Sequence, residues 1–122
     1  MAVKYLLMIY MNDEVFESLS EAERNAIFAG HDEFGPKVRE SGELIGTAAL
    51  SNPTQSKTVR VRDGVTSATD GPYIETKEYL AGYYAVDCES IERAIELAAM
   101  IPDATLTAIE VRPVMDESGL EI

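Results

Sequence analysis

The chain contains one histidine, His31, and a turn in which the carboxylate of Asp70 precedes Gly71 and Pro72. An imidazole exchanges protons near neutral pH, and a neighbouring carboxylate orients it for that task. His31 and Asp70 therefore form a candidate catalytic pair for general acid–base chemistry. Each has a second, structural interpretation: His31 could bond a backbone carbonyl, and Asp70 could hold the turn through nearby backbone N–H groups.

Candidate substrate-binding side chains surround this turn and continue into the strand that follows it. A glycine lets the backbone approach a ligand closely, and a proline fixes the direction in which the chain leaves. Adjacent residues on a strand point to opposite faces, so one of two neighbouring tyrosines can line a pocket with its hydroxyl and ring. A mixed-charge stretch suits a polar ligand or, equally, a solvated turn. The candidate substrate-binding residues are Gly71, Pro72, Tyr73, Glu75, Lys77, Tyr83 and Tyr84.

Other chemistries lack the residues they need. One histidine and one cysteine, Cys88, stand far apart, and no acidic spacing resembles a calcium-binding loop. No phosphate-binding loop, nucleophile elbow or dinucleotide fingerprint occurs either. The sequence thus predicts no metal and no cofactor, and a structural role for Cys88.

Composition limits the partners. The 122 residues fit one domain, residues 1–122, and carry a net charge of −12, which repels the phosphates of nucleic acids. Lys57, Arg60 and Arg62 form the one basic stretch, either a local anion site or a solvated strand face. No apolar run approaches the ~20 residues of a membrane helix, so we expect no membrane partner. A lone cysteine suits a reducing compartment, and we expect a cytoplasmic location.

The elements that must position these residues follow from periodicity. Residues 5–10 read as a central strand, and a capping box at residues 20–23 begins a helix whose buried stripe contains His31. Gly42 suits the end of that helix, and Gly35 with Pro36 predicts a kink or two shorter helices. A second helix is expected from residue 87 or 88 to Pro102. Further strands are expected at residues 44–50, 57–62, 65–68, 82–86 and 105–112, with a hairpin at Asp63 and Gly64.

This order, strand, helix, strand, hairpin, strand, helix, strand, predicts an α+β fold of the ferredoxin-like split β-α-β type. Both helices would cover the same face of the sheet. The other face then carries apolar side chains without cover from the chain itself. The simplest cover is a second copy, so we expect a homodimer formed through that face.

Residues 69–78 (TDGPYIETKE) and 80–87 (LAGYYAVD) closely resemble the signature of the DGPF-domain group of the YCII-related superfamily. Tyr73 stands where the group's name has phenylalanine, and the resemblance extends over residues 4–114. It implies a dimeric α+β barrel and a His-Asp active-site pair, in which His31 resembles the histidine. Genes of such proteins often lie beside genes for extracytoplasmic-function sigma factors, which implies a possible regulatory role.

Three functions remain open at this stage. The first is a cofactor-free acid–base enzyme that uses His31 and Asp70 in a small-molecule pocket at the dimer interface. The second is a non-catalytic module that binds a metabolite or has a regulatory role linked to sigma-factor systems, and the third is a purely structural dimer. An enzyme needs the histidine and a carboxylate within hydrogen-bond reach beside an open cavity, whereas a binder needs only the cavity.

Overall fold

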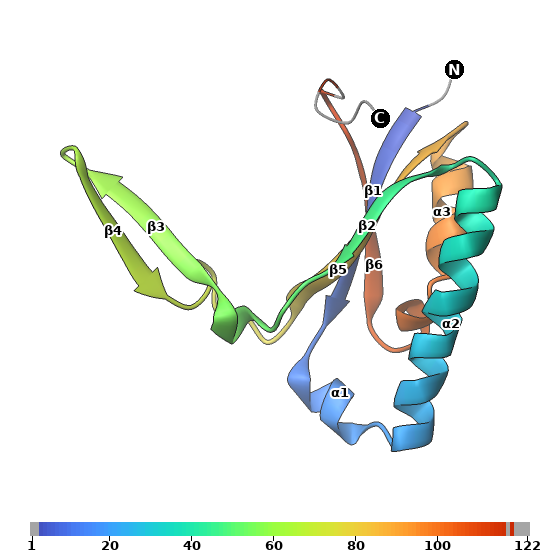
Figure 1. Cartoon of the computed structure of the whole chain (residues 1–122), viewed down its shortest axis with the longest axis horizontal. Coiled ribbons are helices and arrows are strands. Elements are labelled where there is room, and N and C mark those ends of the chain that lie inside the picture. The colour runs from blue at the N-terminus through green and yellow to red at the C-terminus, as the bar shows by residue number, and fades with distance from the viewer. Residues whose placement is uncertain (1–2, 117, 119–122) are drawn as a thin grey trace.

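The structure, a computed structural model, describes residues 3–116 and 118 and has a four-stranded antiparallel sheet at its centre (Figure 1). The strand order is β2-β5-β1-β6, so the first strand is internal, as predicted. The helices α2 (Glu21–Glu40) and α3 (Ile91–Ala99) lie on one face of the sheet. The predicted α+β ferredoxin-like fold is thereby confirmed. The strands are β1 (Val3–Met11), β2 (Leu44–Ala49), β5 (Tyr79–Cys88) and β6 (Ala108–Pro113).

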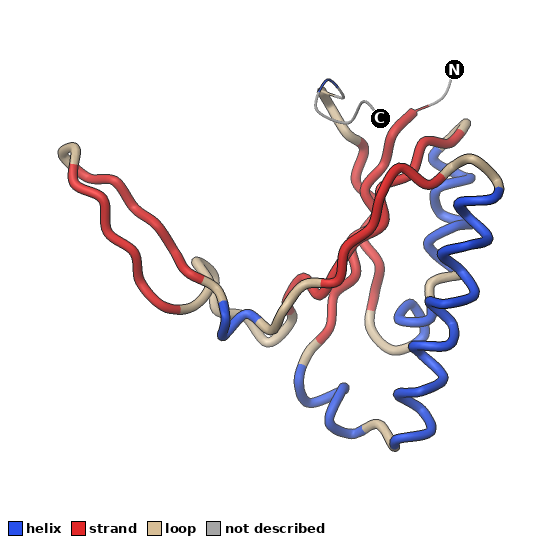
Figure 2. The backbone as a smooth tube through the Cα atoms, viewed as in Figure 1, coloured by secondary structure: helices blue, strands red, loops and turns tan. Residues whose placement is uncertain are grey.

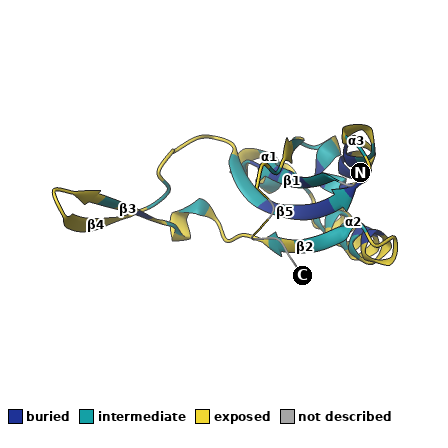
Figure 3. Ribbon diagram, turned by 90° about the horizontal axis from the view of Figure 1, so that it is seen from above, coloured by how far each residue is buried: buried dark blue, intermediate teal, exposed yellow. Residues whose placement is uncertain are grey.

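Alternation along the central strands separates the two faces. Tyr5, Leu7 and Ile9 of β1 are buried, whereas the residues between them are half-buried. Leu7 lies opposite Tyr84 of β5, so Tyr84 shares the helix-covered face, and Met8 lies opposite Tyr83 on the other face. The core therefore forms between the sheet and α2 and α3, where Figure 3 shows the buried residues.

Helix α2 has the predicted start and end. The Ser20 hydroxyl accepts from the Glu23 N–H at 3.1 Å, and the Glu23 carboxylate accepts from the Ser20 N–H at 2.9 Å, which is the capping box. Gly42 follows the helix with φ of 83°, a conformation that glycine adopts without strain.

The kink predicted at Gly35 and Pro36 does not divide the helix, which is continuous through Pro36. A proline ring normally clashes with the Cβ of the residue before it and disfavours helical geometry there. Gly35 has no Cβ, and Pro36 is exposed, so the ring is accommodated on the solvent side. The helix keeps its register, which holds His31 on the same stripe as Phe34 and Val38.

The second helix begins later than predicted. β5 extends to Cys88, and Ser90 caps α3 by accepting from the Arg93 N–H at 3.1 Å. The helical spacing of Ile91, Ala94, Ile95, Ala98 and Ile101 predicts one buried stripe. Ile91 and Ile95 instead face solvent, at 38% and 55% exposed. The observed stripe consists of Ala94, Leu97, Ala98 and Ile101.

The last strand also begins later than predicted, at Ala108 instead of residue 105. Pro102 opens a short 3-10 turn, η2 (Pro102–Thr105), between α3 and β6. Its backbone N–H groups bond back to the turn, as in the Leu106 N–H to Asp103 O bond of 3.0 Å. This turn places Asp103 under α2, and Asp103 is buried.

Two smaller features complete the architecture (Figure 2). A short helix, α1 (Asp13–Ser18), follows β1, and a 3-10 turn, η1 (Pro53–Gln55), follows β2. The strands β3 (Lys57–Arg62) and β4 (Val65–Asp70) form the predicted hairpin, in which Asp63 and Gly64 have φ of 52° and 77°. This hairpin is a separate two-stranded sheet that projects from the side of the main sheet opposite the helices (Figures 1 and 3). Among the described residues, no helix combines the length and apolar character needed to span a membrane.

Candidate functional site

His31 bonds through both ring nitrogens. Its Nε2 lies 2.6 Å from Asp103 Oδ1, and its Nδ1 lies 2.7 Å from the Tyr84 hydroxyl oxygen. The His31 side chain is 26% exposed, and that of Asp103 only 8%, so the carboxylate is shielded while the imidazole reaches the surface of a cavity. The three groups form a continuous chain from a buried carboxylate to a tyrosine hydroxyl.

Three elements hold these side chains. The inward stripe of α2 supplies His31 one turn before Phe34, and β5 supplies Tyr84 from the centre of the sheet. The Tyr84 ring lies nearly parallel to the imidazole, with centroids 5.9 Å apart, and meets the Phe34 ring edge-on at 4.9 Å. The turn η2 supplies Asp103 from beneath the helix. Tight packing on two sides therefore fixes the orientation of the tyrosine.

A close approach between α2 and η2 makes the Asp103 contact possible. Gly30 precedes His31, and Pro102 precedes Asp103, and the two lie directly against one another. A Cβ at residue 30 would overlap with the Pro102 ring. The absence of a side chain at Gly30 thus lets the helix come within hydrogen-bond distance of the turn.

The chemistry of the partners assigns the protons. An ionised carboxylate only accepts, so Asp103 requires a proton on Nε2 of His31. The unprotonated Nδ1 then accepts from the Tyr84 hydroxyl. Burial, together with the charges of Asp103 and Asp32, raises the pKa of Tyr84. The hydroxyl is therefore neutral and available as a donor at neutral pH.

A cavity of about 640 Å³ opens beside the triad, between the sheet and helices α1 and α2. Its size is typical of small-molecule sites. Most of its wall is apolar, and its polar groups include His31, Tyr84 and Asp103 at one place. The remaining lining residues are Ile9, Met11, Asp13, Phe16, Ile27, Phe28, Asp32, Thr47, Ala48, Ala49, Leu50, Asn52, Tyr79, Ala81 and Gly82.

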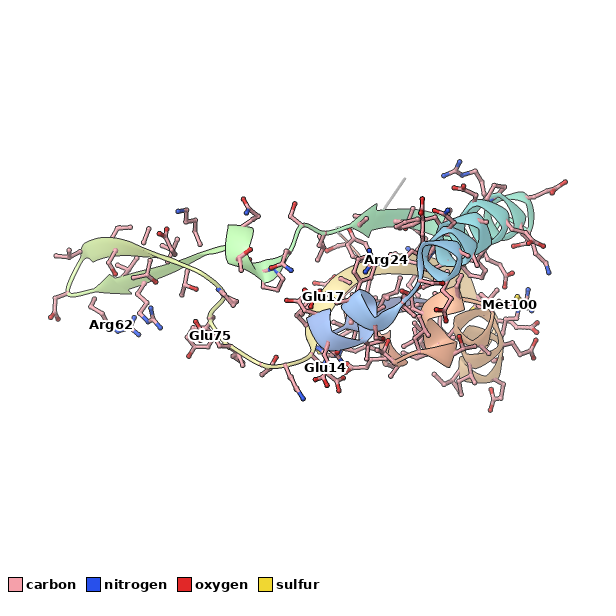
Figure 4. The ribbon with its side chains drawn as sticks, turned by 90° about the horizontal axis from the view of Figure 1, so that it is seen from below. Glu14, Glu17, Arg24, Arg62, Glu75 and Met100 are labelled. Carbon is pink, nitrogen blue, oxygen red and sulfur yellow. The ribbon has the colours of Figure 1, made fainter. Side chains whose placement is uncertain are left out.

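Helix α1 closes one end of this cavity, and Arg24 of α2 attaches it (Figure 4). The Arg24 guanidinium donates to the Phe16 carbonyl at 3.1 Å and lies 4.7 Å from the centre of the Phe16 ring. At the other wall, the Tyr79 hydroxyl donates to Asp13 at 2.7 Å. Burial and the Asp13 carboxylate raise the pKa of Tyr79 to about 12, so this hydroxyl also remains protonated.

The carboxylate partner of His31 is Asp103 and not Asp70, which corrects the predicted pair. Asp70 ends β4, its side chain is 87% exposed, and it bonds Lys57 across the hairpin. The sequence predicts that Asp70 lies beside His31, whereas Asp70 belongs to the hairpin, which is a sheet separate from the one that carries the cavity. At the turn itself, Gly71 has φ of 96°, and its N–H donates to the Ser56 carbonyl at 2.8 Å.

The other candidates near the turn also lie outside the cavity. Tyr73 is 74% exposed, and the Arg60 guanidinium lies 5.5 Å from the centre of its ring. Lys77 pairs with Glu14 at 3.0 Å, and both side chains are exposed. Pro72 lines a second, shallower hollow at the base of the hairpin. Glu75 is exposed and follows the turn.

Of the two adjacent tyrosines, Tyr84 lines the cavity, while Tyr83 points to the uncovered face beside Met8 and Ala48. The cavity therefore lies on the helix-covered side of one chain, whereas the sequence placed it at the uncovered, dimer-forming face. Among the predicted site residues, His31 and Tyr84 are brought together by the fold.

Sequence reasoning missed Asp103. It lies 72 residues from His31, in the short segment between the expected second helix and the expected last strand. One signal was present in the sequence. Asp103 directly follows Pro102, the proline after α3, where the chain has to turn back beneath the helices. Cys88 is buried, and burial raises the pKa of its thiol, which suits the structural role predicted for it.

Comparison with known proteins identifies the family of the chain. A family model described as the YCII-related domain matches residues 3–118. A curated protein of Rhizobium meliloti (strain 1021), "Uncharacterized protein R00369", is 32% identical over 111 residues, which cover 89% of this chain and 90% of that protein. The chain therefore belongs to the YCII-related domain family.

Proposed function

We propose that the chain is a small acid–base enzyme that needs no cofactor and transfers a proton to and from a small molecule in the cavity beside His31. The observation that carries this proposal is the Asp103–His31–Tyr84 chain, with contacts of 2.6 and 2.7 Å. Enzymes activate hydroxyl groups by hydrogen-bonding them to a base, and a carboxylate that is hydrogen-bonded to the base orients it.

The contacts assign a role to each group. Both nitrogens of His31 are engaged, so a substrate proton passes first to the Tyr84 oxygen. Tyr84 simultaneously gives its own proton to Nδ1 of His31, and Asp103 stabilises the resulting imidazolium. The tyrosine ends neutral, the substrate becomes an anion, and the reverse transfer returns a proton to it. Asp103, whose side chain is only 8% exposed, acts as the positioning group.

The cavity wall restricts the substrate. Most of its surface is apolar, and its charged lining residues are the three carboxylates of Asp13, Asp32 and Asp103. Among the described residues that line it, none is lysine or arginine. An anionic ligand would be repelled, so a neutral, mainly apolar molecule with one acidic C–H or O–H group fits best.

A non-catalytic module that binds a metabolite is the second candidate. The cavity favours it equally, because binding requires only the apolar wall and one polar anchor. The resemblance to DGPF-type proteins adds a possible regulatory connection to sigma-factor systems. In this case His31 and Tyr84 would orient the ligand without exchanging protons with it.

Hydrogen–deuterium exchange into a bound ligand separates the two candidates. A library of neutral ketones and lactones, whose acidic C–H protons exchange slowly without a catalyst, would be screened by saturation-transfer NMR, and each ligand would then be incubated with protein in D2O. We expect the wild type to catalyse exchange at the acidic position, and Tyr84→Phe and His31→Gln to bind the ligand with little exchange. Binding by the wild type without any catalysed exchange would contradict the enzyme proposal and favour the binding module.

We also propose that the chain forms a homodimer through the uncovered face of the sheet, in the cytoplasm. Leu6, Met8 and Tyr83 are half-buried on this face, and the helices leave it uncovered. Burial of such side chains against a second copy would remove apolar surface from water. In this arrangement each chain retains its own cavity on the opposite, helix-covered side.

A further inference from the structure

The hairpin arm, β3 and β4 with their connecting turn, has almost no support from the rest of the chain. Every residue of β4 is exposed, and Val59, Val61 and Val65 are 60%, 57% and 67% exposed. An isolated two-stranded hairpin is at best marginally stable in water. β-Branched residues nevertheless alternate along β3, so we expect the arm to pack against another surface.

The two faces of the arm differ in cover. On one face, at the base, the Thr58 hydroxyl donates to the Gly71 carbonyl at 2.8 Å, and Arg60 lies over Tyr73. The chain's own loop therefore covers the base of this face. The opposite face carries Val59 paired with Ala68 and Val61 paired with Thr66, and nothing in the described part of the chain lies on it. This apolar arm face is the unpartnered one.

The position of the arm restricts the partner. It rises on the side of the sheet opposite α2 and α3, the same side as the uncovered sheet face (Figure 1). Strands of six residues span ~20 Å, whereas two stacked sheets lie only ~10 Å apart. A second copy packed on the uncovered sheet face therefore lies alongside the arm.

Charge favours the same partner. Residues 57–70 contain three basic and two acidic residues, a net charge of +1, within a chain of net charge −12. The remaining residues therefore carry a net charge of −13, so a weakly basic arm is attracted to the acidic remainder of a second copy. Arg62 stands toward the outer part of the arm, where Figure 4 shows it far from the helices of its own chain.

We infer that the arm of each chain clasps the second copy of a homodimer, with Val59, Val61 and Ala68 packed against apolar surface of the partner. This inference rests on the homodimer proposed above and adds a second, reciprocal contact to it. By two-fold symmetry each copy gives one arm and receives one, so the contact closes the dimer without leaving a free site.

Adjacent arm residues provide a matched test. Ala68→Asp places a carboxylate on the apolar arm face, and Ser67→Asp places the same group one residue away on the opposite face. Dimer dissociation constants would be measured by analytical ultracentrifugation. We expect Ala68→Asp to raise the constant by at least ~10-fold, because an unpaired charge is costly in an apolar contact. Ser67→Asp should change it by less than about twofold.

Two further proteins keep the outcomes separate. In one, residues 58–69 are replaced by Asn-Gly, which joins Lys57 to Asp70 by a two-residue turn. In the other, Met8→Asp disrupts the uncovered sheet face. We expect both to weaken the dimer while circular dichroism shows the main fold intact.

The contradicting results are distinct. A dimer weakened by Met8→Asp but unchanged by arm removal and by Ala68→Asp would overturn the clasp and leave the homodimer standing. Equal weakening by Ala68→Asp and Ser67→Asp would overturn the assigned face. A wild type that remains monomeric at all concentrations would overturn the clasp and the homodimer together.

Discussion

His31 engages both ring nitrogens, and this determines what each neighbouring residue contributes. Asp103 fixes the tautomer by accepting from Nε2, and Tyr84 then meets Nδ1 as a donor. The His31–Asp103 contact requires α2 to lie close to η2. The His31–Tyr84 contact requires the Tyr84 side chain to be held in place. Gly30 and Phe34, which have no polar side-chain atoms, thereby control the polar geometry.

Gly30→Ala should destabilise the protein by about 1–3 kcal/mol, because the new methyl group overlaps with Pro102 and forces the helix and the turn apart. The same separation should lengthen the His31–Asp103 contact. Chemical denaturation would measure the first effect, and imidazole 15N shifts would show a smaller preference for the Nε2–H tautomer. Asn25→Ala, an exposed change on the same helix, is the control and should leave both measurements unchanged. Wild-type stability and wild-type shifts in Gly30→Ala would contradict the assigned role of Gly30.

Asp103→Ala should cost about 1–3 kcal/mol of folding free energy, because it leaves the partly buried Nε2–H of His31 without its charged acceptor. Urea unfolding would measure it. Asp32→Ala removes an exposed carboxylate from the neighbourhood of the same triad and should shift stability by less than about 0.5 kcal/mol. Similar losses in both variants would argue that general charge, and not the hydrogen bond, is responsible.

At the scale of elements, the contacts between segments far apart in sequence join the helices to each other. Arg93 of α3 forms a forked pair with Glu43, just after α2, through contacts of 3.0 and 2.9 Å. Ser41 donates to the same carboxylate at 2.9 Å. The hydrogen bonds from Arg93 lower the pKa of Glu43. The pair ties the end of α2 to the beginning of α3 above the sheet.

Stability should consequently depend on pH through Glu43. Its pKa is lower in the folded state than in the unfolded chain, so its contribution is complete above the ordinary glutamate value of about 4.3. That contribution is lost as pH falls through the lower, folded value. We expect Glu43→Gln to be about 1 kcal/mol less stable than wild type at pH 7 and to approach it below pH ~4. Thermal or urea unfolding at several pH values measures this, with Glu40→Gln as an exposed control. A difference that is constant with pH would contradict the assignment.

At the scale of the whole molecule, the helices and the arm lie on opposite sides of the sheet (Figure 1). The helix side holds the core and the candidate site. The other side presents half-buried apolar side chains from two central strands and an exposed hairpin. This asymmetry separates the chemistry proposed for the cavity from the assembly proposed for the opposite face.

Met8→Asp should convert the homodimer to a monomer, because it places a charge at the centre of the uncovered face, opposite Tyr83. Light scattering at micromolar concentration should give twice 13.4 kDa for wild type and 13.4 kDa for the variant. Ile95→Asp replaces an apolar side chain that is 55% exposed on the helix side, and it should remain dimeric. Loss of the dimer in Ile95→Asp alone would place the interface on the helices.

The sequence by itself determined the local elements, because the information for them is local. The capping box at Ser20, the alternation along β1 and the turn at Asp63 and Gly64 each depend on residues a few positions apart. The α+β order then followed, since few arrangements of these elements bury their apolar faces. His31 could be assigned to the inward stripe of its helix for the same reason.

Only the tertiary structure decided the partner of His31 and the side on which the cavity opens. Asp103 comes within 2.6 Å of His31 because α2, α3 and η2 pack together, and no spacing in the chain encodes that approach across 72 residues. Asp70 was the wrong carboxylate because it ends β4 at the base of the arm, where it pairs with Lys57 and lies outside the cavity that His31 lines. A strand's direction relative to the sheet depends on its packing, and packing is a property of the folded chain as a whole.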